Sequence, residues 1–217
     1  MRAVMVIGAS RGIGLELVRQ YLAEGCRVHA TTRTLDKPGA LGRLAGDLAL
    51  HELDVCNADQ IAALRQSIAD EGIDVLIHNA GVYGKGMSRE TVMHVNAEAP
   101  IQVTGALFDA VLRGKEKKIV LMTSQMGARR GNRGDLGDYG ESKALLNDRF
   151  RELAPAWGQS GIIAIVMHPG WVRTDMGGQG AALSPRESVA GIRNVIARMG
   201  PQDHGRFWTW DGREHPW

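Results

Sequence analysis

The sequence predicts an α/β protein, with a doubly wound parallel sheet flanked by helices and a single domain over residues 1–217. Short, nearly continuous apolar runs alternate with longer amphipathic stretches along the chain. Apolar runs of this kind are typical of strands buried on both faces, as in parallel sheets. No Pro/Ser-rich linker or internal repeat interrupts the alternation. A βαβαβ order places ligands at the carboxyl ends of the strands.

These patterns place the individual elements. Strands are expected at residues 3–7, 27–31, 51–55, 74–78, 118–123, 162–168 and 206–210, and helices at residues 11–25, 57–72, 96–114, 140–158 and 184–199. Asn57 and Ser184 stand at the start of two of these helices, where their side chains can accept hydrogen bonds from free backbone amides. Pro100 lacks an N–H group, so we expect a kink or a new helical segment just after Asn96.

Composition narrows the class of partner. The 217 residues carry a net charge of only +2, with 44% hydrophobic and 23% charged residues. This balance is ordinary for a globular protein and gives no electrostatic reason to expect a nucleic-acid or membrane partner. The two cysteines, Cys26 and Cys56, form no metal or redox motif, so we expect reduced thiols. The first apolar run is too short for a signal segment, and we expect a cytoplasmic protein.

A glycine-rich segment follows the first expected strand and opens the first helix. It reads GASRGIG, and its residues are Gly8, Ala9, Ser10, Arg11, Gly12, Ile13 and Gly14. Glycines allow a sharp turn and a close approach to a pyrophosphate, and the start of a helix favours an anion. The segment lacks the Gly-Lys-Ser/Thr ending of a nucleoside-triphosphate loop. It predicts a dinucleotide site of the Rossmann type, and a plain βα turn is the alternative.

The end of the second strand indicates which dinucleotide is preferred. An acidic residue there would bind the ribose 2′-hydroxyl of NAD, whereas arginine suits the 2′-phosphate of NADP. The sequence has Thr31, Thr32 and Arg33 at this point, and Arg11 lies within the glycine segment. We therefore predict that NADP(H) is favoured over NAD(H). The alternative is that both arginines are solvated surface residues.

Six short motifs follow one another in a recognisable order. They are GASRGIG at 8–14, HNAG at 78–81, VN at 95–96, Ser124 after the fifth strand, YGESK at 139–143 and HPGWVRTDM at 168–176. Tyr139 and Lys143 alone would read as an ordinary pair on one helical face. Together the six motifs resemble the short-chain dehydrogenase/reductase family over essentially the whole chain. The segments HPGWVRTDMGG and GRFWTWDGREHPW resemble the C-factor and sniffer-type carbonyl reductase branch of that family.

The resemblance implies a role for each matching residue. Tyr139 would be the general acid and base, with Lys143 binding the nicotinamide ribose and favouring ionisation of the phenol. Ser124 would hold the substrate oxygen, and Asn96 would keep a water near Lys143. The remaining cofactor contacts that the resemblance implies are Asp54, Val55, Asn79, Ala80, Gly81, Pro169, Gly170, Val172 and Thr174. It also implies a homodimer or homotetramer formed through helices 98–113 and 138–157.

Elementary chemistry is consistent with these roles. A tyrosine with an ordinary pKa near 10 needs a shift of about 3 units, or about 4 kcal/mol, to exchange protons at neutral pH. A nearby ammonium and a positive nicotinamide ring both favour the phenolate. Structural alternatives remain: Ser124 could cap a strand end, Asn96 could be satisfied by backbone, and Tyr139 could lie on the surface. His168 is interpreted as a packed or rim residue, and no spacing suggests a metal site.

Two stretches beside the expected site depart from the family pattern. Fourteen residues, Gln125 to Asp138, separate Ser124 from Tyr139, and they form a polar stretch rich in Gly, Arg and Asp. Its arginines, Arg129, Arg130 and Arg133, could favour an anionic substrate, although a solvated loop is the preferred interpretation. The segment 171–184 is short, so we expect an open substrate pocket that accepts a range of carbonyl compounds. Its candidate walls are Tyr83, Met126, Trp171 and Met176.

The sequence thus favours an NADP(H)-dependent carbonyl reductase or alcohol dehydrogenase acting on a small carbonyl or alcohol substrate. One alternative is a nucleotide-binding, C-factor-like signalling protein with secondary or no turnover. Another is a structural dimer that keeps the fold without turnover. The joint presence of Asn96, Ser124, Tyr139 and Lys143 favours the enzyme, because a binding protein has no chemical need for all four.

Overall fold

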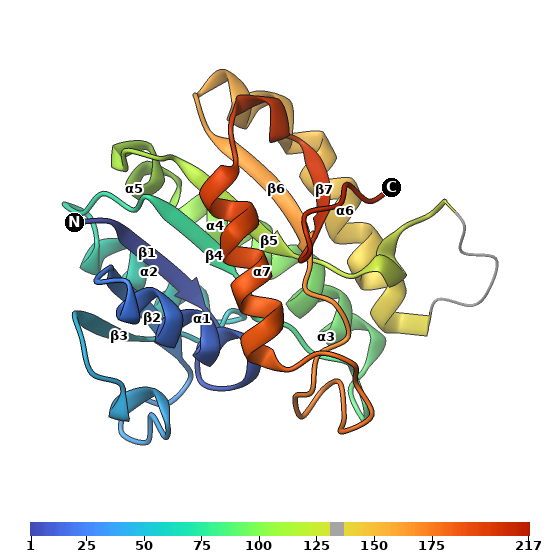
Figure 1. Ribbon diagram of the computed structural model, residues 1–217, viewed down its shortest axis with the longest axis horizontal. Helices are drawn as coiled ribbons and strands as arrows, with labels where there is room; N and C mark the ends of the chain where they lie inside the picture. Colours follow the sequence, from blue (N-terminus) through green and yellow to red (C-terminus); the bar gives the residue numbers. More distant parts are fainter. Residues whose placement is uncertain (131–136) are drawn as a thin grey trace.

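The protein is built around a seven-stranded, all-parallel sheet (Figure 1). The computed structural model describes residues 1–130 and 137–217. The strand order is β3-β2-β1-β4-β5-β6-β7, and each neighbouring pair is parallel. The strands are β1 (Ala3–Ile7), β2 (Arg27–Thr32), β3 (Leu48–Glu52), β4 (Val75–His78), β5 (Lys118–Met122), β6 (Ile163–His168) and β7 (Arg206–Thr209). The predicted doubly wound α/β fold is confirmed.

Helices cover both faces of the sheet. The α-helices are α1 (Gly12–Ala23), α2 (Ala58–Ser67), α3 (Arg89–Met93), α4 (Ala99–Ala106), α5 (Phe108–Arg113), α6 (Gly137–Gln159) and α7 (Pro185–Arg198). Short helical turns are η1 (Leu41–Arg43), η2 (His94–Glu98), η3 (Gln125–Gly127) and η4 (Pro201–Asp203). Helices α1 and α7 share one hydrophobic core with the sheet, and α2, α4, α5 and α6 share the other.

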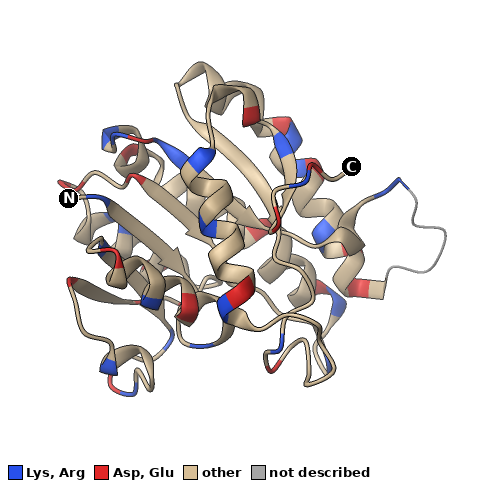
Figure 2. Ribbon diagram, in the orientation of Figure 1, with Lys and Arg blue, Asp and Glu red and all other residues tan. Residues whose placement is uncertain are grey.

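Burial on both faces explains the continuous apolar runs. In β1, Met5 and Ile7 belong to the core beneath α2, α4, α5 and α6, whereas Val4 and Val6 belong to the core beneath α1 and α7. Successive side chains point to opposite faces of a strand, so two covered faces require apolar residues at every position. Charged side chains of both signs lie mainly on the helices and loops around this sheet (Figure 2).

Two predicted elements differ from the observed ones. The third strand is Leu48–Glu52, not 51–55, because this edge strand is only half-buried and its apolar signal is weak. The helix expected at 96–114 is divided into η2, α4 and α5, and α3 was not predicted. The break near Asn96 confirms the predicted effect of Pro100. The two predicted caps are also confirmed, since Asn57 and Ser184 accept bonds from the first amides of α2 and α7.

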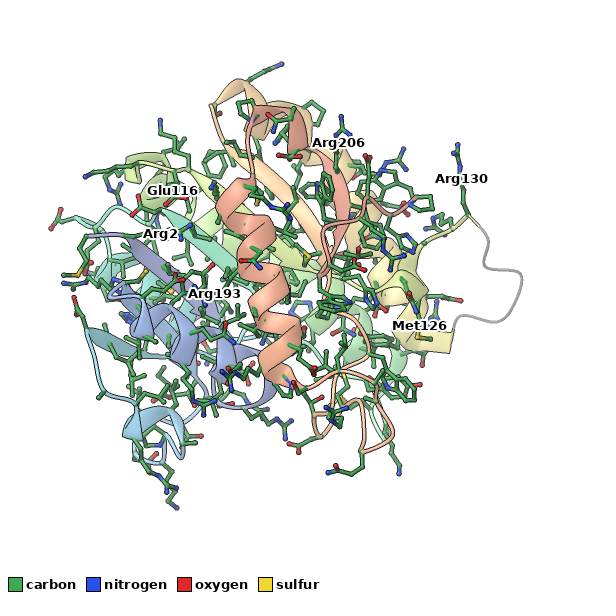
Figure 3. All side chains as sticks on the ribbon, viewed as in Figure 1. Arg2, Glu116, Met126, Arg130, Arg193 and Arg206 are labelled. Carbon is green, nitrogen blue, oxygen red and sulfur yellow. The ribbon has the colours of Figure 1, made fainter. Side chains whose placement is uncertain are left out.

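Charged groups also link α1 and α7 near the amino end of β1. The Tyr21 ring in α1 lies between the guanidinium carbons of Arg2 and Arg193, at 5.6 and 5.1 Å from the ring centroid. Arg2 pairs with Glu116 and Arg193 pairs with Glu24. Figure 3 labels Arg2, Glu116 and Arg193 in the same part of the molecule. Burial raises the pKa of Tyr21, so its phenol stays neutral.

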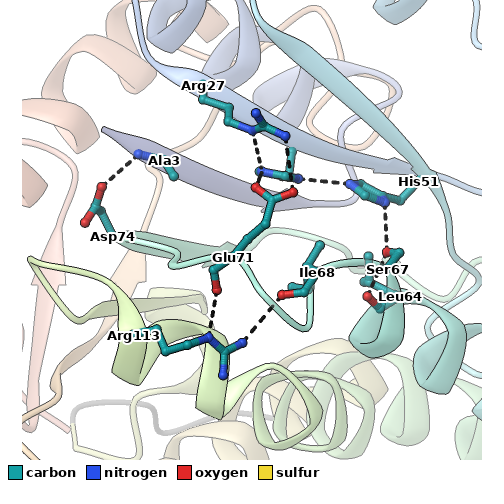
Figure 4. Close-up of polar contacts among 10 residues, drawn as sticks. Ala3, Arg27, His51, Leu64, Ser67, Ile68, Glu71, Asp74 and Arg113 are labelled. Atoms are coloured by element: carbon teal, nitrogen blue, oxygen red, sulfur yellow. Dashed lines mark hydrogen bonds and ion pairs between the residues drawn. The ribbon is translucent and has the colours of Figure 1, made fainter. Parts of the chain in front are cut away.

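A polar network joins β2 and β3 to the end of α2 (Figure 4). His29 Nδ1 lies 3.1 Å from His51 Nε2, and His29 Nε2 lies 3.0 Å from Glu71 Oε2. Arg27 donates to Glu71 at 3.2 Å, and the Ser67 hydroxyl lies 3.4 Å from His51 Nδ1. Burial lowers the pKa of both histidines, and that of His51 falls to about 4. The two imidazoles are therefore neutral at neutral pH.

One further feature concerns membranes. Among the described residues, none of the helices combines the length and the apolar character needed to cross a bilayer.

The buried histidines predict a stability that depends on pH. His51 has a folded pKa of about 4, below its ordinary value near 6.5, so the unfolded chain binds protons first as the pH falls. The stabilisation is complete above about pH 6.5 and is lost toward about pH 4. We expect Tm, followed by circular dichroism, to fall over this range. His51→Asn should flatten the fall relative to the wild type, and an unchanged slope would contradict the assignment.

Candidate active site

The predicted site residues come together at one edge of the sheet. Gly8 follows β1, Asn79 follows β4, Ser124 lies two residues beyond β5, and Pro169 follows β6. The strands are parallel, so their carboxyl ends lie along the same edge. Residues separated by more than 150 positions in the chain therefore meet there.

The glycine segment is packed tightly against the chain after β4. Gly8 has φ +80°, and a Cβ added there would lie 2.7 Å from the Ala80 Cα. A Cβ on Gly14 would lie 2.1 Å from the Gly8 carbonyl oxygen, which already accepts from Asn79 Nδ2 at 2.8 Å. Gly12 has φ +56° and begins α1. Larger residues are sterically excluded here, and the amides at the start of α1 can face a bound anion.

The remaining residues of the glycine segment differ in burial. Ser10 and Arg11 are exposed, and Ile13 packs against the core beneath α1 and α7. Arg11 Nη1 forms an ion pair with Asp175 Oδ2 at 2.9 Å. Asp175 was not among the predicted site residues. A pair between residues 164 positions apart leaves no signal in the sequence.

The expected adenosine end lies beyond β2 and β3. Arg33 is exposed directly after Thr32, the last residue of β2. Asp54 Oδ1 accepts from the Cys56 amide at 3.0 Å, and its own amide donates to Gln60 Oε1 at 2.5 Å. Val55 is buried in the core. The structure thus places Arg33, Asp54 and Val55 beyond the carboxyl ends of neighbouring strands, on the side of β1 opposite Ser124.

The side chain of Asn96 is used to hold the chain after β4. It is fully buried, its Oδ1 accepts from the Val82 amide at 2.9 Å, and its Nδ2 donates to the Val82 carbonyl at 2.8 Å. Nδ2 also lies 3.0 Å from the Ser142 hydroxyl. This satisfaction by backbone is the structural alternative weighed for Asn96, and the side chain has no free polar atom for another role.

The backbone carbonyl of Asn96 lacks the donor that it would have in a regular α-helix. Residue 100 is proline, so the Asn96 carbonyl has no N–H donor four residues further on. The chain compensates with a π-helical turn over His94–Glu98, in which the Ala99 amide reaches the His94 carbonyl. Such turns often mark functional sites. The Asn96 carbonyl therefore lacks the donor that a regular α-helix would supply.

Lys143 is a buried cation in α6. Its side chain is 4% exposed, and Nζ donates to the Met122 carbonyl at 2.9 Å. A Cβ added to Gly81 would lie 3.5 Å from Lys143 Nζ and 3.1 Å from Asn96 Oδ1, so the three residues are in contact distance. Burial lowers the pKa of Lys143 to about 8. The Met122 carbonyl is the hydrogen-bond partner of Lys143 among residues 1–130 and 137–217, which leaves two N–H groups of the buried ammonium able to bind a ligand.

The Tyr139 side chain is half-buried beside Ser124. Burial raises the pKa of Tyr139, the Ser124 hydroxyl opposes this by hydrogen-bonding to the phenol, and Tyr83 adds a small increase. Lys143 is not among the groups that shift the pKa of Tyr139 in the cofactor-free protein, and its ammonium donates to the Met122 carbonyl. That Lys143 favours ionisation of Tyr139 when the cofactor is bound stays a prediction. Ser124 also caps η3 by accepting from the Met126 amide at 3.1 Å.

The segment after β6 closes the other side of the site. Gly170 has φ +85°, and a Cβ there would lie 2.4 Å from Leu183 Cδ1. Val172 pairs with Leu183 in a short bridge. The Pro169 carbonyl accepts from Ser188 at 2.6 Å, which anchors the segment to α7. Thr174 approaches the glycine segment, since a Cβ on Gly12 would lie 3.2 Å from its Cγ2.

His78 is a further residue of the site that the sequence did not single out. It ends β4, is 1% exposed, and its Nε2 has no hydrogen-bond partner among the described residues. Burial, followed by the charge of Lys143, lowers the pKa of His78 to about 3. The HNAG motif contains this residue, but the pattern alone gives no sign that its ring faces a buried cation. His168 is likewise packed, as interpreted, with its pKa lowered to about 4 by burial.

Large apolar side chains are exposed on the loops around the site. Tyr83, Met126, Trp171 and Met176, the four predicted pocket walls, are 57%, 38%, 59% and 47% exposed. Met87 is a fifth, which was not predicted. The Tyr83 ring lies 5.1 Å from the Tyr139 ring between centroids. Met126 lies beside the end of α6 in Figure 3. Apolar surface of this kind marks a ligand-binding or interaction site.

The arginines of the Gln125–Asp138 stretch do not form one described cluster in the site. Arg129 pairs with Asp148, and the Arg130 amide donates to the Trp217 carbonyl at 2.9 Å. Arg133 lies outside the described residues. No group of three or more His, Cys, Asp or Glu side chains that could hold a metal ion occurs within residues 1–130 and 137–217.

The fold and this cleft define an α/β dinucleotide-binding protein, and the comparisons specify its family. The family model of the short chain dehydrogenase matches residues 2–182. The chain therefore belongs to the short-chain dehydrogenase/reductase family of oxidoreductases.

Individual relatives indicate the branch of that family. The C-signal protein of Myxococcus xanthus is 35% identical over an alignment of 164 residues, which covers 71% of this chain and 99% of that protein. The NADPH-bound carbonyl reductase from chicken fatty liver has a TM-score of 0.89 at 28% identity, covering 100% of this chain and 99% of its own. The carbonyl reductase Sniffer of D. melanogaster has a TM-score of 0.89 at 26% identity, with 100% of both chains covered. The predicted C-factor and sniffer-type branch is confirmed.

The role of the Asn96 side chain predicts a large loss of stability on truncation. Asn96→Ala would remove the partners of the half-buried N–H and C=O groups of Val82, at about 1–3 kcal/mol for each unsatisfied group. We expect the free energy of unfolding, measured in urea, to fall by roughly 2–5 kcal/mol. Gln66→Ala on the exposed face of α2 is the control and should change it by less than about 0.5 kcal/mol. An equally small effect of Asn96→Ala would contradict the role of the Asn96 side chain in holding Val82.

Proposed function

We propose that the protein is an NADP(H)-dependent oxidoreductase that transfers a hydride between nicotinamide and a carbonyl or secondary alcohol substrate. The observation that carries the proposal is the position of the Tyr139 side chain beside the Ser124 hydroxyl, on the same helix as the buried ammonium of Lys143, at the edge of the sheet where the glycine segment lies. The family is an oxidoreductase family, and several similar structures are carbonyl reductases. The residues present fit a nicotinamide cofactor.

The binding roles follow from the geometry. The amides after Gly8 and at the start of α1 would hold the pyrophosphate, and the missing Cβ of Gly14 lets this segment pack against the Gly8 carbonyl and Asn79. The two unpaired N–H groups of Lys143 would bind the nicotinamide ribose hydroxyls. Pro169 to Thr174 would lie along the nicotinamide, and Asp54 and Val55 beside the adenine. When bound, the nicotinamide supplies or accepts the hydride.

The chemical roles fall to two hydroxyl groups. In reduction, the carbonyl carbon gains the hydride while the carbonyl oxygen takes the proton of the Tyr139 phenol. The Ser124 hydroxyl donates a hydrogen bond to the same oxygen as its negative charge develops. The resulting phenolate would regain a proton along the Lys143 side of the site, where the Asn96 carbonyl, which has no α-helical donor, would hold a water. In oxidation the same groups act in the opposite sense.

The protonation state of Tyr139 bears on both directions of the reaction. Burial raises the pKa of Tyr139, so the phenol of the free protein carries its proton at neutral pH, which is the form that carbonyl reduction uses. Oxidation needs the phenolate, which the positive charge of an oxidised nicotinamide would favour.

The cofactor preference rests on two arginines. Arg33 and Arg11 lie near the expected 2′-phosphate position, and the residue at the end of β2 is not acidic. The chicken carbonyl reductase with NADPH bound has a closely similar fold. We propose that NADP(H) is favoured over NAD(H).

The substrate region supports a range of apolar carbonyl compounds. Tyr83, Met126, Trp171 and Met176 lie on the segments that follow β4, β5 and β6 and offer exposed apolar and aromatic surface. Shape-specific recognition needs several placed hydrogen-bond partners, whereas apolar walls discriminate weakly between similar substrates.

A signalling role is a second candidate, favoured by the 35% identity to C-signal. In that role the protein would bind the dinucleotide and a turnover step would be secondary.

Tyr139→Phe separates the two candidates. Loss of the acidic hydroxyl should lower kcat for carbonyl reduction by about 10²–10⁴-fold, the usual contribution of a general acid. NADPH binding, measured by fluorescence titration, should change by less than about twofold because Lys143 and the glycine segment are retained. A variant with unaltered turnover would refute the role of Tyr139. Biological activity that persists without turnover would favour signalling.

Lys143 predicts a decline of activity at alkaline pH. Its pKa is about 8, so the ammonium and its bonds to the ribose are lost as the pH rises through this value. The ratio kcat/KM for NADPH, which reports on the free protein, should be constant near neutral pH and fall above about pH 8. Lys143→Met should have low activity and no inflection there. A wild-type profile that stays level well above pH 8 would contradict this assignment.

A further inference from the structure

The ion pair between Arg11 and Asp175 bridges the two segments that enclose the cofactor cleft. Arg11 belongs to the glycine segment after β1, and Asp175 belongs to the segment after β6. The two segments are in direct contact here, because a Cβ on Gly12 would lie 3.2 Å from Thr174 Cγ2. The pair therefore lies on the cleft itself and not on a remote surface.

Asp175 is held in position by its own turn. The Thr174 hydroxyl accepts from the Gly177 amide at 3.1 Å, and the Thr174 carbonyl accepts from the Gly178 amide at 2.9 Å. These bonds fix the backbone on both sides of Asp175. Its carboxylate thus stays close to the glycine segment.

Arg11 is free to exchange partners. It is the N-cap residue of α1, but its side chain makes no capping hydrogen bond. Both side chains of the ion pair are about three-quarters exposed, at 73% for Arg11 and 74% for Asp175, so breaking the pair buries no uncompensated charge. Arg33, the other arginine proposed for the 2′-phosphate, has no ion-pair partner among the described residues.

We propose that Asp175 is a specificity-determining residue that competes with the 2′-phosphate of NADP(H) for Arg11. A guanidinium binds a carboxylate and a phosphate oxygen with the same fork of N–H donors, so one ligand displaces the other. NAD(H) has no 2′-phosphate and leaves the Arg11–Asp175 pair intact. Asp175 therefore weakens NADP(H) binding selectively and moderates the preference that the two arginines create. This inference rests on the proposed function through its assignment of Arg11.

The test measures dissociation constants by calorimetry, without turnover. NADPH and NADH are titrated into the full-length wild type, Asp175→Asn, Arg11→Ala and the double variant. An exposed ion pair of ordinary strength corresponds to about a two- to fivefold change in binding. Asp175→Asn should tighten NADPH by this factor and leave NADH within about 1.5-fold, the limit expected when no ion pair is exchanged. In the Arg11→Ala background the same substitution should have no effect on NADPH.

Asp70→Asn is the matched control. It removes the same charge at an exposed position before β4, at the opposite edge of the sheet, and should leave both dissociation constants unchanged. Equal tightening of NADPH and NADH in Asp175→Asn would overturn the proposal, since it would reflect a general effect on the cleft. An unchanged NADPH affinity would also overturn it.

Failure of the inference can be distinguished from failure of the cofactor assignment. If Arg11→Ala weakens NADPH but not NADH, while Asp175→Asn leaves NADPH unchanged, competition is refuted and the role of Arg11 stands. If wild type binds both cofactors equally and Arg11→Ala alters neither, the proposed NADP(H) preference is refuted together with the competition. Circular dichroism of each variant establishes that folding is retained.

Discussion

The candidate site depends on the burial of one ammonium group. Lys143 lies within the protein with a single bond to the Met122 carbonyl, and this isolation lowers its pKa to about 8. A buried charge with one neutral partner is costly unless further partners arrive. A ligand with two hydroxyl groups would supply them. The unsatisfied donors of Lys143 are therefore a physical reason for this cleft to bind a ribose.

Neighbouring elements are arranged around that ammonium. The Asn96 side chain holds Val82 and so fixes the chain that carries Gly81, where a larger residue would crowd Asn96 Oδ1. Pro100 denies the Asn96 carbonyl its α-helical partner, and the chain forms a π-helical turn there. The buried ring of His78 has a nitrogen without a partner among the described residues, and the charge of Lys143 acts on it. The side chain of Asn96 thus has a structural role, and its backbone carbonyl is open to the role proposed for it.

Much of this arrangement could be predicted from sequence because it depends on chain order. Parallel strands bring their carboxyl ends to one edge, so Gly8, Ser124 and Pro169 could be placed together without coordinates. The break near Asn96 could be predicted from Pro100, because a missing N–H group disturbs the helical turn in which it lies. The half-buried edge strand β3 was misplaced because it lacks a strong apolar pattern.

Properties set by side-chain direction could not be predicted. The spacing of Tyr139 and Lys143 suggested a cation that lowers the pKa of the phenol. In the structure Lys143 bonds to β5, and burial raises the pKa of Tyr139. The Arg11–Asp175 ion pair could not be predicted either, because the fold brings together two residues that lie far apart in the sequence.

The central claim is that the phenol of Tyr139 is held as a protonated acid by burial beside Lys143. The most direct measurement is a near-ultraviolet titration of the cofactor-free protein, with the spectrum of the variant lacking this hydroxyl subtracted. The account predicts that no phenolate signal from residue 139 appears below the ordinary tyrosine value near 10. A phenolate that forms around neutral pH would contradict it.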